Sequence, residues 1–217
     1  MTVVAHRQAS RIVAELTLGR VIDDRSVPRP AWRATTENAV TADILTGFLG
    51  GSMRRCVTRK GPAFEIQSER RSVQVVLDGP EAITLQLKKW GPRGLTHHCD
   101  GSAFLSPLSV LGNPCGCPPS MVNRRMRARA GIGPQPITTI HGRLAGVFDA
   151  GVIRFRSSSW QLAEKLAPVR GGIAAWGRPT QCELLANSRE FFVASGRRVS
   201  YCEPELNVMS CGLTLAS

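Results

Sequence analysis

The chain has 217 residues, of which 42% are hydrophobic and 20% charged, and this fits one ordinary globular domain or two small ones. Its 21 glycines and 14 prolines follow no period, which excludes a collagen-like chain. No apolar run reaches the roughly 18 residues that a membrane span needs, and the N-terminus lacks a signal-peptide pattern. We therefore expect an intracellular, cytoplasmic protein with no membrane partner.

The chain is strongly basic, with 28 Lys and Arg residues against 16 Asp and Glu residues, a net charge of +12. Such a charge attracts acidic partners, but it does not choose among nucleic acid, an acidic protein face and an anionic membrane. The seven cysteines are an odd number in a chain without a secretory signal, which favours reduced thiols or metal ligands over disulfides.

The first half of the chain predicts one helix and several strands. Residues 13–21 are apolar enough for a strand. Thr35 and Thr36 can cap a helix over residues 37–49, where apolar residues recur four positions apart and Gly50 follows. Apolar and polar residues alternate over 73–77 and 83–87, which predicts two strands joined by a turn at Asp78-Gly79-Pro80.

The second half predicts two further helices and a hairpin. Ser120 can cap a short helix to residue 130, and a Ser158-x-x-Gln161 capping box predicts another that Pro168 stops. Strands are expected at 137–144 and 152–156, and a hairpin at 191–201. This irregular alternation predicts an α+β fold with a largely antiparallel sheet and a few packed helices.

The expected organisation has three parts. A basic N-terminal segment, residues 1–36, joins the core; residues 37–208 form the α+β domain; and residues 209–217 form a C-terminal tail. Within the domain, residues 97–119 form a loop rich in turn residues and cysteines.

This loop is the strongest candidate site, because Cys99, Cys115 and Cys117 lie in a segment too poor in apolar residues to hold itself by burial. Thiolates and an imidazole around a tetrahedral Zn²⁺ can fix such a segment. We take His98 as the fourth ligand, with His97 equally near in sequence. The other candidates for the fourth ligand are Cys56, Cys182, Cys202 and water. The alternative to a metal site is three reduced thiols without a metal.

No enzyme is expected. Pro114-Cys115-Gly116-Cys117 is one residue short of the Pro-Cys-x-x-Cys motif of zinc deaminases, and the chain has no His-x-Glu. The phosphate-loop, dinucleotide-binding, zinc-protease and serine-hydrolase motifs are also missing from the sequence. His141 falls in an expected strand and is interpreted as structural.

The helix after the cysteine loop carries four arginines and no acidic residue, so its guanidinium groups lack local partners. They could bind phosphates or carboxylates, or form a solvated face. The candidate binding residues are Arg124, Arg125, Arg127 and Arg129.

Taken in order, several segments resemble the recombination directionality factors of large serine integrases, a family of phage and actinobacterial proteins. The most specific are the Cys99-Asp100-Gly101 to Pro114-Cys115-Gly116-Cys117-Pro118 block and the Phe155-x-Ser157-x-Ser159-Trp160 junction. The others are Leu18-Gly19-Arg20, Arg29-Pro30, Trp32-Arg33, Gly50-Gly51, Gly133-Pro134-Gln135-Pro136, Gly151-Val152-Ile153-Arg154 and Val199-Ser200-Tyr201.

The resemblance implies a non-catalytic accessory protein that binds a large serine integrase and shifts recombination toward prophage excision. It also implies that Cys99, Cys115 and Cys117 are metal ligands. Family members with a fourth cysteine have it near the position of Gly131-Ile132-Gly133, so here a histidine substitutes or no metal binds. DNA backbone within the integrase complex is a further expected partner, and no small-molecule substrate is expected. The alternatives are a zinc-stabilised DNA- or RNA-binding protein and an unrecognised hydrolase.

Overall fold

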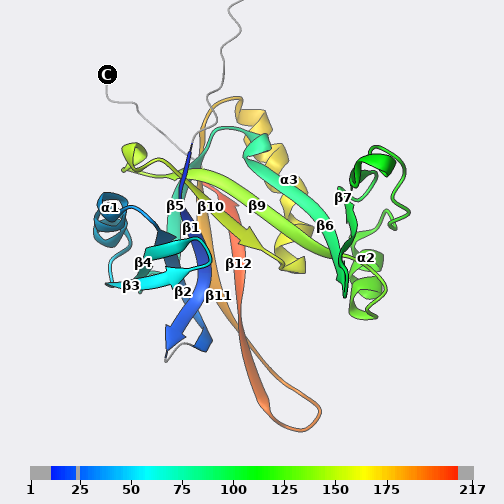
Figure 1. Cartoon of the computed structure of the whole chain (residues 1–217), viewed down its shortest axis with the longest axis horizontal. Helices are drawn as coiled ribbons and strands as arrows, with labels where there is room; N and C mark the ends of the chain where they lie inside the picture. Colours follow the sequence, from blue (N-terminus) through cyan, green and yellow to red (C-terminus); the bar gives the residue numbers. More distant parts are fainter. Residues whose placement is uncertain (1–10, 23–24, 210–217) are drawn as a thin grey trace, which may run out of the picture.

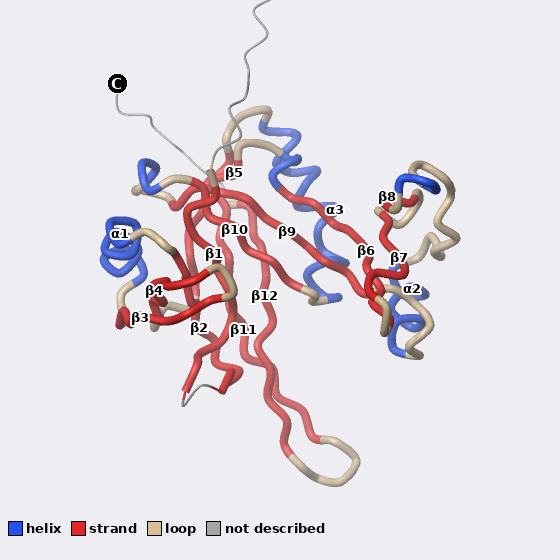
Figure 2. The backbone as a smooth tube through the Cα atoms, in the orientation of Figure 1, coloured by secondary structure: helices blue, strands red, loops and turns tan. Residues whose placement is uncertain are grey.

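The computed structural model describes residues 11–22 and 25–209, which form a twelve-stranded sheet and three α-helices (Figures 1 and 2). The expected α+β class with a largely antiparallel sheet is confirmed. The elements in chain order are β1 (Ile12–Ile22), β2 (Arg25–Thr36), α1 (Ala39–Leu49), β3 (Ser52–Thr58), β4 (Gly61–Gln67), β5 (Ser72–Leu77), β6 (Ile83–Gly91), β7 (Gly94–Cys99), β8 (Phe104–Ser106), α2 (Met121–Arg129), β9 (Gln135–Leu144), β10 (Val152–Ser157), α3 (Trp160–Trp176), β11 (Thr180–Phe192) and β12 (Arg198–Val208).

The main sheet has the order β12-β11-β5-β9-β10-β1-β2-β4-β3, and β9 is its branch point. One edge of β9 pairs with β10, while the other edge is shared between β5, at Arg143 and Leu144, and β6, at residues 135–140. β6 therefore leaves the main sheet and carries β7 and β8 with it. Figure 1 shows this branch reaching away from the body toward α2.

The core lies inside the curved main sheet, because β2 packs against β11 and β12 from across the fold. Its centre is Trp32 on β2, which is fully buried and meets Phe155 of β10 edge to face at 5.2 Å. The Trp32 indole N–H donates to the carbonyl oxygen of Arg71 at 3.1 Å, so its one polar group is satisfied. The large cluster around this pair includes side chains from α1, α3 and most strands of the main sheet.

Two helices cover parts of the main sheet. α1 packs against β4 and β2 and begins at Asn38, whose side chain accepts a hydrogen bond from the backbone N–H of Thr41. α3 packs against β12 and β9 and begins at Ser159, whose hydroxyl accepts from the backbone N–H of Leu162. The predicted caps at Thr35, Thr36 and Ser158 are therefore displaced by one to three residues.

The prediction that Pro168 stops the third helix is wrong, because α3 continues to Trp176 and ends at the left-handed Gly177. Pro168 lies on the exposed side of α3, where water can satisfy the carbonyl group that loses its helical partner. Leu166 and Ile173 are buried on either side of it in the core. Packing of this helix on the sheet outweighs the local preference of the proline.

The predicted strands at 13–21, 73–77, 83–87, 137–144 and 152–156 all form. The strands at 73–77 and 83–87 are not paired with each other, however, because both pair with β9. Strands β2, β3 and β4 were not predicted. β3 is an edge strand with largely exposed side chains, so it carries no clear apolar alternation.

The predicted hairpin at 191–201 is the tip of a much longer one formed by β11 and β12. The pairing runs from Cys182 and Val208 in the body to Phe192 and Arg198 at the tip, and the tip projects clear of the main sheet (Figure 1). Phe191 and Tyr201 stack edge to face on one side of the tip, 6.0 Å apart.

Residues 12–22 and 25–36 belong to the same sheet as the rest of the chain, with Leu16 and Trp32 in its core. Residues 1–10, and 210–217 of the expected tail, lie outside the described part of the chain. Within that part, no helix combines the length and apolar character required to cross a membrane.

Replacing the central tryptophan should test this core. We expect Trp32→Ala to lower the free energy of unfolding by about 3–5 kcal/mol, since it opens a large cavity and removes a hydrogen bond. Urea denaturation would measure the change. Trp90→Ala is the matched control, because Trp90 is 68% exposed and its loss should cost less than about 0.5 kcal/mol. Equal effects of the two substitutions would contradict this account of the core.

Candidate metal centre

The candidate metal site lies on the branch of the sheet, in a unit formed by residues 83–134 that we call the cysteine lobe. β7 supplies His97 and Cys99, and the loop after β8 supplies Cys115 and Cys117. Because side chains alternate across a strand, positions 97 and 99 of β7 point to the same face. One strand and one loop thus bring four potential ligands together, although the pair on the strand and the pair in the loop are 18 residues apart in the chain.

The four ligand atoms form a compact group in which all lie within 4.8 Å of one another. The Sγ atoms of Cys99 and Cys117 are 3.7 Å apart, and Nε2 of His97 lies 3.1 Å from Cys99 Sγ and 3.5 Å from Cys117 Sγ. Tetrahedral Zn²⁺ with Zn–S near 2.3 Å and Zn–N near 2.0 Å requires S–S separations of about 3.8 Å and N–S separations of about 3.5 Å. The three separations among His97, Cys99 and Cys117 lie within about 0.4 Å of these values, and the four residues together could hold a metal ion.

His98, the expected fourth ligand, points away from this cluster. Its Nδ1 lies 2.9 Å from the Ser106 hydroxyl on β8, and its Nε2 lies 3.2 Å from the Gln86 side-chain oxygen on β6. His97 takes the place that we assigned to His98. The alternation of a strand that includes Cys99 could have identified it, but no pattern in the residues before Cys99 extends a strand into this loop.

The turn after Cys99 is held by its own polar groups. Asp100 Oδ1 accepts hydrogen bonds from the backbone N–H groups of Ser102 and Ala103, and these bonds lower the pKa of the Asp100 carboxyl. Gly101 has a φ of +102°, and a Cβ there would lie 2.5 Å from the Arg124 guanidinium. Cys99-Asp100-Gly101 is therefore a tight turn that requires both its acid and its glycine.

Arg124 connects the two ends of the loop. Its Nη2 donates to the Gly101 carbonyl at 2.8 Å, and its Nε donates to the Pro118 carbonyl at 2.5 Å. Nearby, the backbone N–H of Cys115 donates to the Ser102 carbonyl at 2.9 Å. These bonds hold the segment with Cys115 and Cys117 against the end of β7.

Burial and neighbouring cations adjust the protonation of the ligands. Burial, followed by the charges of Lys89 and Arg127, lowers the pKa of His97, which favours the neutral imidazole that binds metals. Burial raises the pKa of the Cys99 and Cys117 thiols. Burial also opposes ionisation of Cys115, but hydrogen bonds from the Cys117 backbone and the neighbouring thiols lower its pKa overall. A divalent cation would favour the thiolate form of all three.

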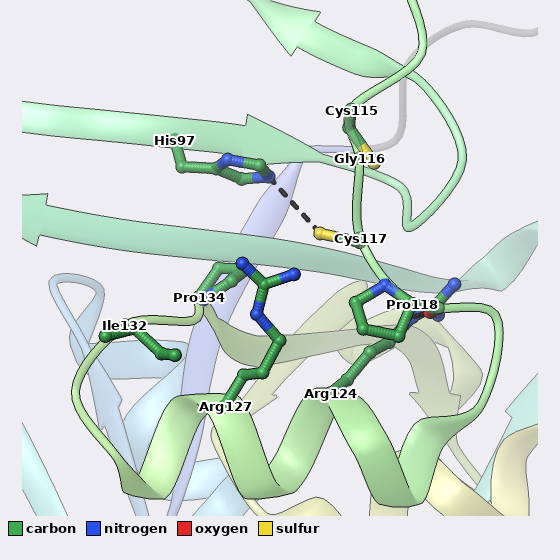
Figure 3. Close-up of a pocket in the computed structure, with 9 residues that line it drawn as sticks. All are labelled: His97, Cys115, Gly116, Cys117, Pro118, Arg124, Arg127, Ile132 and Pro134. Atoms are coloured by element: carbon green, nitrogen blue, oxygen red, sulfur yellow. Dashed lines mark hydrogen bonds between the residues drawn. The ribbon is translucent and has the colours of Figure 1, made fainter.

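A small cavity opens beside the cluster (Figure 3). His97 and Cys117 face each other across it, and the side chain of Arg127 rises from α2 toward it. The ring of Phe104 lies 4.9 Å from that of His97 and packs against it, which restricts how the imidazole can turn. The remaining wall is formed by Cys115, Gly116, Pro118, Arg124, Ile132 and Pro134.

The four candidate arginines of α2 have different surroundings. Arg124 bonds to the loop, as described above, and Arg125 forms an ion pair with Glu164 of α3 at 3.4 Å. Arg127 and Arg129 are exposed. Arg124 therefore holds the lobe together and Arg125 connects it to α3, while the exposed Arg127 lines the cavity and Arg129 faces solvent.

The other thiols lie away from the cluster. Cys182 on β11 is buried in the main core, and Cys56 and Cys202 lie on β3 and β12. Cys211 falls outside the described residues. Within the described residues, the His97, Cys99, Cys115 and Cys117 group is the one set of three or more such ligands close enough to share a metal ion.

Fold and site together define an α+β protein with a Cys₃His cluster on a branch of its sheet. Comparison with known proteins adds no family: no family model matches the chain, and no solved structure matches it significantly.

The two histidines provide a direct test of the ligand assignment. We expect His97→Ala to weaken Co²⁺ binding by about a hundredfold or more, since even residues that only support a ligand cost ten- to a hundredfold. His98→Ala should leave the affinity within a few-fold, because His98 bonds to Ser106 and Gln86 instead. Titration with Co²⁺, followed by its visible absorption bands, would measure both. A larger loss of Co²⁺ affinity in His98→Ala than in His97→Ala would contradict the assignment.

Proposed function

We propose that the cluster holds a structural Zn²⁺ through His97, Cys99, Cys115 and Cys117. Three thiolates and one imidazole are a ligand set that Zn²⁺ favours. All four tetrahedral positions come from the protein, whereas catalytic zinc sites keep one position for water or substrate. The complete set of protein ligands therefore favours a role in folding over one in catalysis.

The small core of the lobe supports this role. Its buried cluster has five residues, namely Leu87, Cys99, Cys115, Ala128 and Trp160, and two of these are proposed ligands. Structural zinc contributes about 10–16 kcal/mol of binding free energy in small zinc-folded peptides. That is enough to fix a segment whose apolar burial is slight.

We further propose that the protein is a non-catalytic accessory factor that binds a large serine integrase and shifts recombination toward excision. The resemblance to the recombination directionality factors rests on two specific motifs, the cysteine block and the Phe155 to Trp160 junction. These motifs are about 40 residues apart in sequence, yet Trp160 packs in the same cluster as Cys99 and Cys115. Its indole N–H also donates to Gln135 of β9 at 3.0 Å. This packing supports the proposal because the two motifs form one structural unit.

The proposed mechanism requires only that the factor bind one integrase state more tightly than another. A partner that bound both states equally would shift no equilibrium, and a change from 1:99 to 99:1 requires about a ten-thousandfold difference in affinity. A rigid surface supports such discrimination, because a flexible one can adapt to both states.

Recombination with purified proteins would test the proposed function. With the cognate integrase, we expect the wild-type protein to promote attL × attR recombination and to inhibit attP × attB recombination. Cys115→Ser with Cys117→Ser should lose this activity together with zinc, while Cys56→Ser, outside the cluster, should retain both. No change in direction with wild-type protein would contradict the proposed function. Tight binding to DNA alone at about 150 mM salt would favour the alternative of a direct DNA-binding protein.

Metal removal should affect the two parts of the molecule differently. We expect a zinc chelator to increase amide hydrogen exchange over β7, β8 and α2, because metal binding stabilises the lobe. Exchange in β9, β10 and β11 should change little, since their core is independent of the cluster. Hydrogen exchange with mass spectrometry would resolve these segments. An equal increase in exchange throughout the chain after chelation would contradict a local role for the metal.

A further inference from the structure

The cysteine lobe exposes an unusual share of apolar surface. Among the described residues, sixteen large hydrophobic side chains are exposed, and seven of them lie in the lobe. The lobe is about a quarter of the chain, but it holds nearly half of these exposed side chains. The seven residues are Trp90, Leu95, Leu108, Leu111, Val122, Met126 and Ile132.

Two of these residues form one surface on α2. Val122 and Met126 are four positions apart, which places them on the same side of the helix, and they are 62% and 63% exposed. Ile132, just after the helix, lines the cavity beside the cysteines instead. We call the surface of Val122 and Met126 the α2 face.

The opposite side of α2 attaches the helix to the lobe. Ala128 is buried in the small core, Met121 packs against it, and Arg124 bonds to the cysteine loop. The inward side is thus used in folding. In the described part of the chain, the α2 face packs in neither hydrophobic cluster.

The α2 face is bordered by positive charge. At 100° per residue, the exposed Arg129 falls about 40° from the centre of the Val122–Met126 stripe, whereas Arg127 falls about 120° away, on the side of the cavity. The whole lobe has seven basic residues and one acidic residue, which is half of the net charge of the chain. That one acid, Asp100, accepts hydrogen bonds within its own turn.

We propose that the α2 face is the contact surface for the partner protein, and that it receives an acidic amphipathic helix. Apolar side chains of that helix would cover Val122 and Met126, while its carboxylates would pair with Arg129. Nucleic acid fits less well, because phosphates would engage Arg129 but leave the apolar stripe exposed to water. Identifying the partner as the integrase rests on the proposed function above; the surface and its chemistry rest on the lobe.

Binding of purified cognate integrase, measured by biolayer interferometry, would test this proposal. We expect Val122→Ser with Met126→Ser to weaken binding at least tenfold. Arg129→Glu should also weaken it, by about threefold or more, and reduce its dependence on salt. Zinc content and melting temperature should remain at wild-type values in both variants, since the substituted side chains are exposed.

Matched controls lie elsewhere on the surface. Val40→Ser replaces a 68% exposed valine on α1, and Arg55→Glu replaces an exposed arginine on β3. We expect both controls to bind within twofold of wild type.

If the α2 variants bind the integrase with wild-type affinity, this proposal is overturned and the proposed function stands. Absence of binding by the wild-type protein would overturn both. Loss of duplex DNA binding in the arginine variant, with integrase binding unchanged in every variant, would overturn the proposal in favour of a nucleic-acid contact.

Discussion

The lobe depends on one constraint, the convergence of three sulfur atoms and one imidazole nitrogen within 4.8 Å. These atoms bring the end of β7 together with a loop that buries little apolar surface, since its Leu108 and Leu111 are exposed. The surrounding bonds serve the same junction: Asp100 closes the turn, and Arg124 connects Gly101 to Pro118. α2 is placed by this junction, because its inward side packs on the cysteine loop and it has only a short strip of core beneath it.

A segment that a bound metal would hold, as proposed, has different surface requirements from one held by a hydrophobic core. In the body, Trp32, Phe155 and their neighbours must face inward, because their burial stabilises the sheet. In the lobe, the junction at the cysteines can hold the backbone with few buried side chains, so valine, methionine and isoleucine can face solvent. The branch at β9 then separates the two parts physically, since β6 carries the lobe away from the body.

Sequence patterns predicted the elements whose stability is local and missed those decided by tertiary packing. The period of four in α1 and the alternation in β5 and β6 are strong signals, and these elements form. The prediction at Pro168 was wrong because the local cost of a proline is smaller than the packing of α3 on the sheet. Cys99, Cys115 and Cys117 were predicted together because they lie in one turn-rich segment with few apolar residues. The choice between His97 and His98 required knowing that β7 continues to Cys99. That depends on the pairing of β7 with β6, a tertiary contact that residue patterns within β7 do not show.

The same pairing explains why the site could form at this place in the fold. β7 pairs with β6, with Leu87 opposite Cys99, and β6 in turn pairs with β9, so the position of two ligands is fixed by the strand at the branch point. Trp160, at the start of α3, bonds to Gln135 at the end of β9 and packs in the small core of the lobe. The helix that covers the main sheet thus reaches the cysteine cluster through one side chain. The lobe is joined to the main sheet both by the pairing of β6 with β9 and by Trp160, so a partner that bound the α2 face, as proposed, would meet a surface attached to the body at two places.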